Sequence, residues 1–254
     1  MHDSTWVATR ADASSGLARL ICLPFAGGGA GAFAAWSRHA PPWLNVAPVR
    51  LPGRDGRAQE PAFTRMEPLV DALTEGLAAW LKPPYVLYGH SLGALVALHL
   101  ADTLARRGLP LPTLLAVGAC RPPPGHAPGP PLHGLDERAL LGELQRRYGG
   151  IPQAIAESPE LRRLFLGPLR ADLCILERLT GPLPDPLPTP LLGFAGEDDP
   201  LVRPEHIEGW GRFSVHDLDV RVVPGGHFFC REAAASQVVN ELVDELGHCL
   251  SVKG

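Results

Sequence analysis

The stretch Tyr85–Leu98, YVLYGHSLGALVAL, joins a short apolar run typical of a buried strand to a longer apolar run typical of a helix. The pattern G-x-S-x-G lies at the junction, as Gly89, Ser91 and Gly93. In a nucleophile elbow a serine sits on a strained strand-to-helix turn, which needs small residues on both sides. This context predicts that Ser91 is a nucleophile at the edge of a sheet. Serine also caps helices, so a purely structural role for Ser91 is the alternative.

Strand-like and helix-like segments alternate along the 254 residues, which is typical of a parallel sheet covered on both faces. The predicted strands are RLICLP, NVAPVRLP, YVLYG, TLLAVGA, PLLGFAG and VRVV, and the predicted helices follow Pro68, Leu92 and Cys230. We therefore predict an α/β fold with a mostly parallel central sheet flanked by helices, in one domain over residues 1–254.

Residues 121–189 break this alternation. RPPPGHAPGPP opens the region, PLPDPLPTP closes it, and segments with apolar residues at helical spacing lie between them. Proline-rich boundaries stiffen and delimit a segment of this kind. We interpret the region as a helical insertion or lid, with a set of surface helices that never move as the alternative.

A serine hydroxyl needs a base that accepts its proton and a third group that orients the base. Of the ten histidines, His227 lies just past a strand-like run, in VRVVPGGHFF, where two glycines free the backbone to turn. The acid is expected in PLLGFAGEDDPLV, where the turn favours Asp199 and leaves Asp198 as a competitor. His90, inside the elbow, is expected to be a packing or hydrogen-bonding neighbour, and His206 and His216 to be solvated surface residues.

The positions of these residues in the predicted sheet are the strongest indication of a catalytic site. Ser91, Asp199 and His227 each follow a separate strand-like run, so a parallel sheet brings all three to its carboxyl edge, where ligands bind in open α/β folds. Their order along the chain, serine then acid then histidine, is that of the α/β-hydrolases.

A glycine-rich loop after the first predicted strand, in CLPFAGGGAGAF, has a role in such a site. Acyl transfer passes through a tetrahedral oxyanion, which backbone N–H groups stabilise. One donor follows the nucleophile, here Leu92, and the other comes from the loop after an early strand. We assign the second donor to Ala26, with Phe25 as the alternative.

The same loop also fits a dinucleotide fingerprint, through Gly29, Gly31 and Ala34. That interpretation needs an acid at the end of the second strand, where NVAPVRLPG supplies Arg50 and no carboxylate. A dinucleotide-binding protein is therefore a remote alternative.

Composition limits the partners. The formal net charge is −4 with no block of like charges, which gives no electrostatic case for binding nucleic acid or an anionic membrane. The N-terminal segment lacks the apolar stretch of a secretory signal, and no apolar run approaches a membrane span, so we expect a cytoplasmic protein. The five cysteines are widely spaced and never form C-x-x-C, which indicates neither a disulfide framework nor a zinc site.

Six ordered motifs make the chain similar to the type II thioesterases, stand-alone α/β-hydrolases that accompany polyketide synthases and nonribosomal peptide synthetases. The motifs are LICLPFAGGGAGAF, RLPGRDGR, YVLYGHSLGALVAL, LGPLRADLCILE, GEDDPLV and VVPGGHFF. The resemblance covers nearly the whole chain. It implies Ser91 as nucleophile, His227 as base, Asp199 as its partner, and no metal or cofactor.

The resemblance further implies an acyl group carried on the phosphopantetheine arm of a carrier protein, with removal of wrong or stalled acyl units as the task. The chain has no carrier-domain pattern, so we expect the carrier in trans. We also expect the enzyme to be a monomer. Leu92 stands where methionine is frequent in the family, and Leu176–Leu179 (LERL) replaces an aromatic; we expect both to bear on acyl-chain preference. Lid arginines could meet an acidic carrier helix, although a solvated helix face explains them too: Arg146, Arg147, Arg162 and Arg163. A carboxylesterase or lipase with the same triad is the nearest rival function, and a non-catalytic binding protein is a further one.

Overall fold

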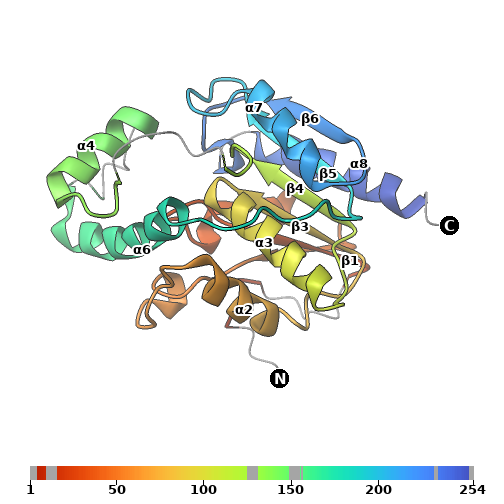
Figure 1. Cartoon of the computed structure of the whole chain (residues 1–254), viewed down its shortest axis with the longest axis horizontal. Coiled ribbons are helices and arrows are strands. Elements are labelled where there is room, and N and C mark those ends of the chain that lie inside the picture. Colours follow the sequence, from red (N-terminus) through yellow and green to blue (C-terminus); the bar gives the residue numbers. More distant parts are fainter. Residues whose placement is uncertain are drawn as a thin grey trace.

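Six parallel strands form one sheet in the computed structural model, which describes residues 5–9, 16–124, 131–148, 155, 157–231 and 234–251 (Figure 1). The strands are β1 (Ala18–Leu23), β2 (Leu44–Pro48), β3 (Tyr85–His90), β4 (Leu114–Gly118), β5 (Leu191–Gly196) and β6 (Leu218–Val223). They lie in the order β2-β1-β3-β4-β5-β6, and each neighbouring pair is parallel. The predicted fold class is confirmed.

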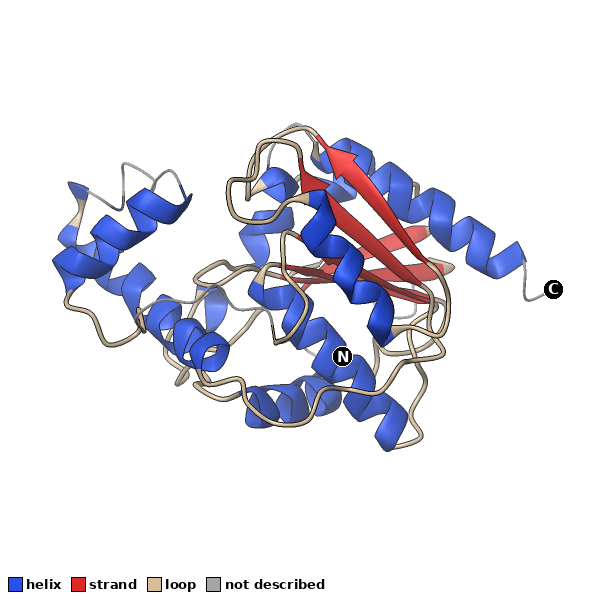
Figure 2. Cartoon of the chain, turned by 45° about the horizontal axis from the view of Figure 1, so that its top comes forward, coloured by secondary structure: helices blue, strands red, loops and turns tan. Residues whose placement is uncertain are grey.

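Helices cover both faces of this sheet (Figure 2). On one face, α2 (Met66–Gly76), α3 (Leu92–Arg106) and α7 (Pro204–Glu208) share a hydrophobic cluster with the strands. On the other, α1 (Trp36–His39) and α8 (Ala235–Ser251) share a second cluster. Short 3-10 turns lie in the connections between these strands and helices: η1 (Ala30–Phe33), η2 (Asp55–Arg57), η3 (Gly209–Phe213) and η4 (Phe229–Arg231).

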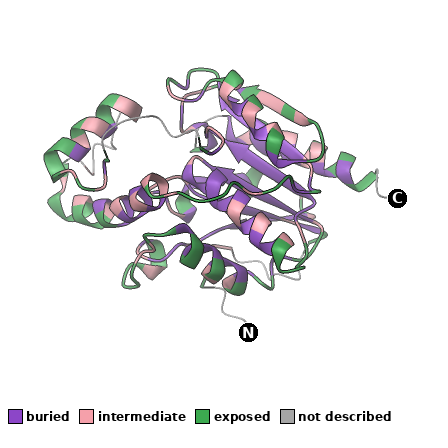
Figure 3. Cartoon of the chain, viewed as in Figure 1, coloured by how far each residue is buried: buried purple, intermediate pink, exposed green. Residues whose placement is uncertain are grey.

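Strands β2, β3, β4 and β5 are buried along their whole length because side chains of both faces meet helices (Figure 3). This is why they appear in the sequence as continuous apolar runs rather than as alternating ones. The edge strand β6 differs, since only Val223 of its six residues is buried and Val222 is 48% exposed.

Two predicted helix boundaries need correction. The helix expected after Pro68 begins at Met66, because proline in the first helical turn lacks only an N–H that has no helical partner there. The last helix begins at Ala235 rather than directly after Cys230, since the turn η4 comes first.

Between β4 and β5 the chain forms α4 (Glu137–Tyr148) and α6 (Pro159–Glu177), which extend away from the sheet (Figure 1). They share a small core of their own, formed by Leu132, Leu140, Leu144, Leu166, Leu169 and Leu173. Parts of the predicted lid, at 125–130, 149–154 and 156, lie outside the described residues.

The topology of the sheet positions the site. The strand β1 pairs with β2 on one side and with β3 on the other, so the connections after β1 and β3 leave the sheet in opposite directions. Ligands bind at such a switch point in open α/β sheets. The glycine-rich loop follows β1 and the serine follows β3, so both lie at this crevice.

Candidate active site

The turn between β3 and α3 holds Ser91 at φ 54° and ψ −117°, a conformation that L-residues rarely adopt. A Cβ atom on Gly89 would lie 2.1 Å from the carbonyl oxygen of Gly93, and one on Gly93 would lie 2.2 Å from that of Leu23. Neither position has room for a side chain, which accounts for both glycines of G-x-S-x-G. The N–H of Ser91 donates to the carbonyl of Gly118, 2.8 Å away, and ties the elbow to the end of β4.

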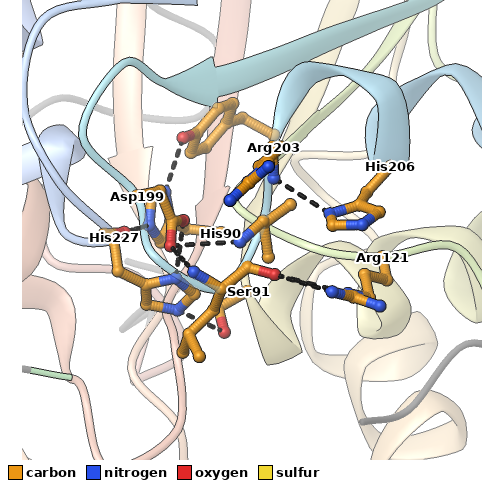
Figure 4. A network of polar contacts seen from close by, with 10 residues as sticks. His90, Ser91, Arg121, Asp199, Arg203, His206 and His227 are labelled. Atoms are coloured by element: carbon orange, nitrogen blue, oxygen red, sulfur yellow. Dashed lines mark hydrogen bonds and ion pairs between the residues drawn. The ribbon is translucent and has the colours of Figure 1, made fainter. Parts of the chain in front are cut away.

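His227 lies between the serine and an acid (Figure 4). Its Nε2 is 3.2 Å from Ser91 Oγ, and its Nδ1 is 2.8 Å from Asp199 Oδ2. The structure thus brings together the three residues that the sequence places at the ends of separate strands. Asp198, the competing acid, is exposed, and its N–H donates to the carbonyl of Gly225.

The surroundings of Asp199 keep its carboxylate charged. Its Oδ1 accepts hydrogen bonds from the N–H groups of Leu201 (2.8 Å) and Val202 (3.2 Å), while Oδ2 faces His227. Burial alone would raise the pKa of this carboxyl, but the hydrogen bond and the charge interaction with His227, helped by the two backbone N–H groups, outweigh it and hold the pKa of Asp199 below its usual value. A carboxylate of this kind orients the imidazole and stabilises its protonated form.

His90 is a hydrogen-bonding neighbour, as the sequence predicts. Its Nε2 lies 2.7 Å from the carbonyl oxygen of His227, and its Nδ1 lies 2.8 Å from the hydroxyl of Tyr88. Because a carbonyl only accepts, Nε2 carries the proton and Nδ1 accepts from Tyr88. Burial, followed by the nearby His227 ring, lowers the pKa of His90 to about 3, so this imidazole is neutral at physiological pH.

Arg121 contacts the loop that contains Asp199, and the sequence does not predict this contact. Its Nε and Nη2 lie 3.3 and 3.1 Å from the carbonyl oxygen of Leu201, in the loop after β5 that contains Asp199 (Figure 4). The sequence shows Arg121 only as the first residue of a proline-rich region, and no local pattern indicates this contact. His206 lies further out, where its Nδ1 accepts from the N–H of Arg203.

The glycine-rich loop forms a tight turn beside the serine. The N–H of Gly28 donates to the carbonyl of Phe25 at 2.8 Å, and Gly27 has φ +71°, which the third residue of a type II turn requires. Within the described residues, no hydrogen bond joins the N–H of Ala26, the second residue of the turn. Leu92 is the first residue of α3, so its N–H has no partner in the helix.

The dinucleotide interpretation finds no support in this loop. The N–H of Ala30, which opens η1 and would face a phosphate, donates to Asp55 Oδ2 at 2.9 Å. A Cβ atom on Gly29 would lie 2.5 Å from the same carboxylate. A negative charge thus occupies the place that a pyrophosphate needs.

A cavity of about 500 Å³ lies in front of the serine and the histidine. The glycine-rich loop lines one side, and apolar side chains from α4 and α6 line the other: Leu144, Tyr148, Phe165, Leu169 and Leu173. The Tyr148 ring packs against the His227 ring, with 5.2 Å between the ring centroids. The cavity can hold an apolar group next to Ser91 Oγ.

In the part of the chain that the structure describes, no cluster of three or more metal-binding side chains occurs. None of the described helices combines the length and the apolar character that crossing a bilayer requires.

Comparisons with known proteins identify the family. The model of the thioesterase domain family matches residues 18–246. The gramicidin S biosynthesis protein GrsT of Aneurinibacillus migulanus is 31% identical, over 85% of this chain and 84% of that protein. Among solved structures, the thioesterase RedJ of the prodiginine pathway in Streptomyces coelicolor is 34% identical with a TM-score of 0.83, covering 93% of this chain and 89% of RedJ. YbtT, a type II thioesterase from the yersiniabactin NRPS/PKS pathway, is 31% identical with a TM-score of 0.80, covering 93% of this chain and 95% of YbtT.

The fold and the site define a serine hydrolase of the α/β type. The chain belongs to the thioesterase family, and its relatives include type II thioesterases of nonribosomal peptide and polyketide pathways. The resemblance seen in the sequence motifs and the expected thioester hydrolase activity are confirmed.

Proposed function

We propose that this protein hydrolyses acyl thioesters on the phosphopantetheine arms of carrier proteins that it meets in trans. It would remove aberrant or stalled acyl groups in polyketide or nonribosomal peptide biosynthesis. Family membership and the pathways of GrsT, RedJ and YbtT support the substrate class. The observation that carries the chemistry is the continuous contact from Ser91 Oγ through His227 to Asp199, at the edge of an acyl-sized cavity.

In the first step, Ser91 Oγ attacks the thioester carbonyl carbon and passes its proton to His227 Nε2. Asp199 orients the imidazole through Nδ1 and stabilises the imidazolium. The N–H groups of Leu92 and Ala26, or of Phe25 in place of Ala26, hold the oxyanion. Collapse of the intermediate expels the pantetheine thiolate, which takes the proton from His227 and leaves an acyl-serine ester.

In the second step, His227 removes a proton from water, which attacks the ester carbonyl, and the same N–H groups hold the second oxyanion. The proton then returns to Ser91 Oγ and the free acid leaves. The sequence of steps needs neither metal nor cofactor.

The insertion at 121–189 acts, in this proposal, as a lid within a single domain of 254 residues. Its support is the apolar side that α4 and α6 give to the cavity, next to Ser91. Closure would exclude water from the thioester until the acyl-enzyme forms.

Two glutamates contact three of the four lid arginines considered for carrier docking. Arg146 and Arg147 both contact Glu143, and Arg162 contacts Glu137. Arg163 is exposed on α6. The arginines therefore provide less charge for an acidic carrier helix than their number in the sequence indicates.

The test compares hydrolysis rates for one acyl group presented as a carrier-bound thioester and as a matched oxygen ester. We expect a higher kcat/KM for the carrier thioester and full activity in the presence of a metal chelator. A preference for the free oxygen ester would favour the carboxylesterase interpretation, and loss of activity with the chelator would contradict the mechanism.

A further inference from the structure

Two sequence motifs remain without a role after the mechanism is assigned, RLPGRDGR after β2 and LGPLRADLCILE in α6. The structure brings one buried residue from each together. Arg54 Nη1 lies 2.6 Å from Asp172 Oδ2, and Arg54 Nη2 lies 2.8 Å from Asp172 Oδ1. The guanidinium and the carboxylate therefore form a bidentate ion pair. The exposed fractions of the two side chains are 7% and 3%.

Both members of this pair also bind the turn that follows β1. Asp172 Oδ2 accepts the N–H of Gly27 at 2.8 Å, and Arg54 Nη1 donates to the carbonyl of Gly28 at 3.0 Å. Gly27 directly follows Ala26, whose N–H is the proposed oxyanion donor. The pair therefore holds two peptide groups that follow this donor in the chain, Ala26–Gly27 through its N–H and Gly28–Gly29 through its carbonyl.

A buried ion pair generally adds little to the free energy of unfolding. The cost of removing two charges from water roughly cancels their attraction, and well-packed apolar residues often do as well. Its specific property here is geometric, since a rigid guanidinium fork and a carboxylate fix the direction of each N–H and C=O that they bind.

Packing supports the same arrangement. A Cβ atom on Gly27 would lie 3.2 Å from side-chain atoms of Leu169 and Phe165, so the turn lies directly against α6. Beyond it, Asp55 holds the N–H of Ala30. The loop is thus fixed on both sides of Gly29, and it has little freedom to move independently of α6.

Resting on the proposed function, we propose that Arg54 and Asp172 are positioning residues that hold the Phe25–Gly28 turn in place for the oxyanion and fix this turn to α6. The part of α6 that contains Asp172, beyond Pro168, then stays fixed to the oxyanion hole during lid movement.

The test uses the variants Asp172→Asn and Arg54→Met/Asp172→Leu. The double variant removes the pair without leaving a buried charge unpaired. Glu137→Gln is the control, because it breaks the contact between α4 and α6 through Arg162 but touches no residue of the turn. For each variant we would measure kcat, KM, the inhibition constant of a trifluoromethyl ketone that forms a tetrahedral adduct with serine, and the melting temperature.

We expect kcat to fall about 10- to 100-fold in both Asp172 variants with KM within about threefold, which is less than the complete loss of one donor costs. Affinity for the trifluoromethyl ketone should fall in parallel, because its adduct places an oxyanion in the same hole. The control should stay within twofold of the wild type in kcat. A double variant that folds and keeps wild-type kcat would overturn the proposal, and so would a rise in KM without a loss in kcat.

The rate at which a fluorophosphonate labels Ser91 separates this proposal from the proposed function. Labelling also develops negative charge on an oxygen in the hole, but it requires no carrier or thioester. A wild-type protein that is labelled but inactive on carrier thioesters would contradict the proposed function alone. Equal labelling rates in the wild type and the folded double variant would contradict the positioning role alone.

Discussion

His90 Nε2 donates a hydrogen bond to the carbonyl oxygen of His227 at 2.7 Å, so the residue before Ser91, the proposed nucleophile, holds the backbone of His227, the proposed base. The hydroxyl of Tyr88 fixes the other ring nitrogen of His90. His90, the last residue of β3, thus contacts the backbone of His227, and Ser91, which follows it, contacts the side chain.

Replacing His90 tests this relationship. His90→Ala leaves the Tyr88 hydroxyl and the His227 carbonyl without partners in a buried place, at a cost of about 1–3 kcal/mol for each buried polar group. His90→Gln keeps an N–H donor for the carbonyl and should lose less. Urea unfolding measures the stability and kcat the activity of both variants. Equal losses in the two variants would contradict a hydrogen-bonding role.

Stability should also depend on pH through His90. Its folded-state pKa of about 3 lies below the ordinary value of 6.5, because of burial. Between these values the unfolded chain binds a proton that the folded chain does not, so the free energy of unfolding falls as the pH falls from about 6.5. Each such group contributes a slope of about 1.4 kcal/mol per pH unit.

Urea unfolding between pH 4 and pH 7 measures that slope. The pKa of His99 is also lowered by burial, so part of the slope remains when His90 is replaced. We expect a smaller slope in His90→Gln than in the wild type. The same slope in both proteins would show that His90 takes up its proton normally in the folded state.

The two adjacent aspartates provide a matched comparison. Asp199→Asn should lower kcat by about 10³- to 10⁴-fold, because an amide favours the wrong tautomer of His227. Asp198→Asn should leave kcat within about twofold, because this side chain is exposed and the carboxylate bound to His227 Nδ1 belongs to Asp199. A large effect of Asp198→Asn with a small one of Asp199→Asn would reverse the assignment.

The glycines of the elbow allow another paired test. Gly93→Ala places a methyl group 2.2 Å from the Leu23 carbonyl, so we expect a loss of several degrees in melting temperature, or failure to fold. Gly247→Ala, in α8, meets nothing within 4 Å and should increase stability by about 0.5–1 kcal/mol, the helix propensity difference. Calorimetry of both variants measures this contrast. A stable, active Gly93→Ala would contradict the close approach.

The sequence predicts much of this architecture because buried parallel strands appear as apolar runs and because such strands end at one edge. Ser91, Asp199 and His227 follow from those two facts together with the chemistry of a serine nucleophile. The choice between Asp199 and Asp198 needs coordinates, since a loop that slips by one residue exchanges their positions. The N–H groups of Leu201 and Val202, which fix the choice, belong to the backbone and leave no pattern in the sequence.

Contacts between segments that are far apart in the sequence cannot be predicted from it either, because they too leave no local pattern. Arg54 and Asp172 are separated by 118 residues, and Arg121 and Leu201 by 80. The three charged residues among them, Arg54, Asp172 and Arg121, also fit an ordinary solvated surface in their local sequence. Only the packing of α6 and of the loop after β5 shows that they are partners.

Mass spectrometry of an acyl-loaded carrier protein tests the central claim most directly. Incubation with the wild-type enzyme should convert the acylated carrier to the free phosphopantetheine form, while Ser91→Ala with the same melting temperature should leave the acyl group in place. Loss of the acyl group at the same rate with Ser91→Ala as with the wild type would contradict Ser91 as the nucleophile. An acyl group that stays on every loaded carrier in the presence of the wild-type enzyme would contradict the proposed substrate class.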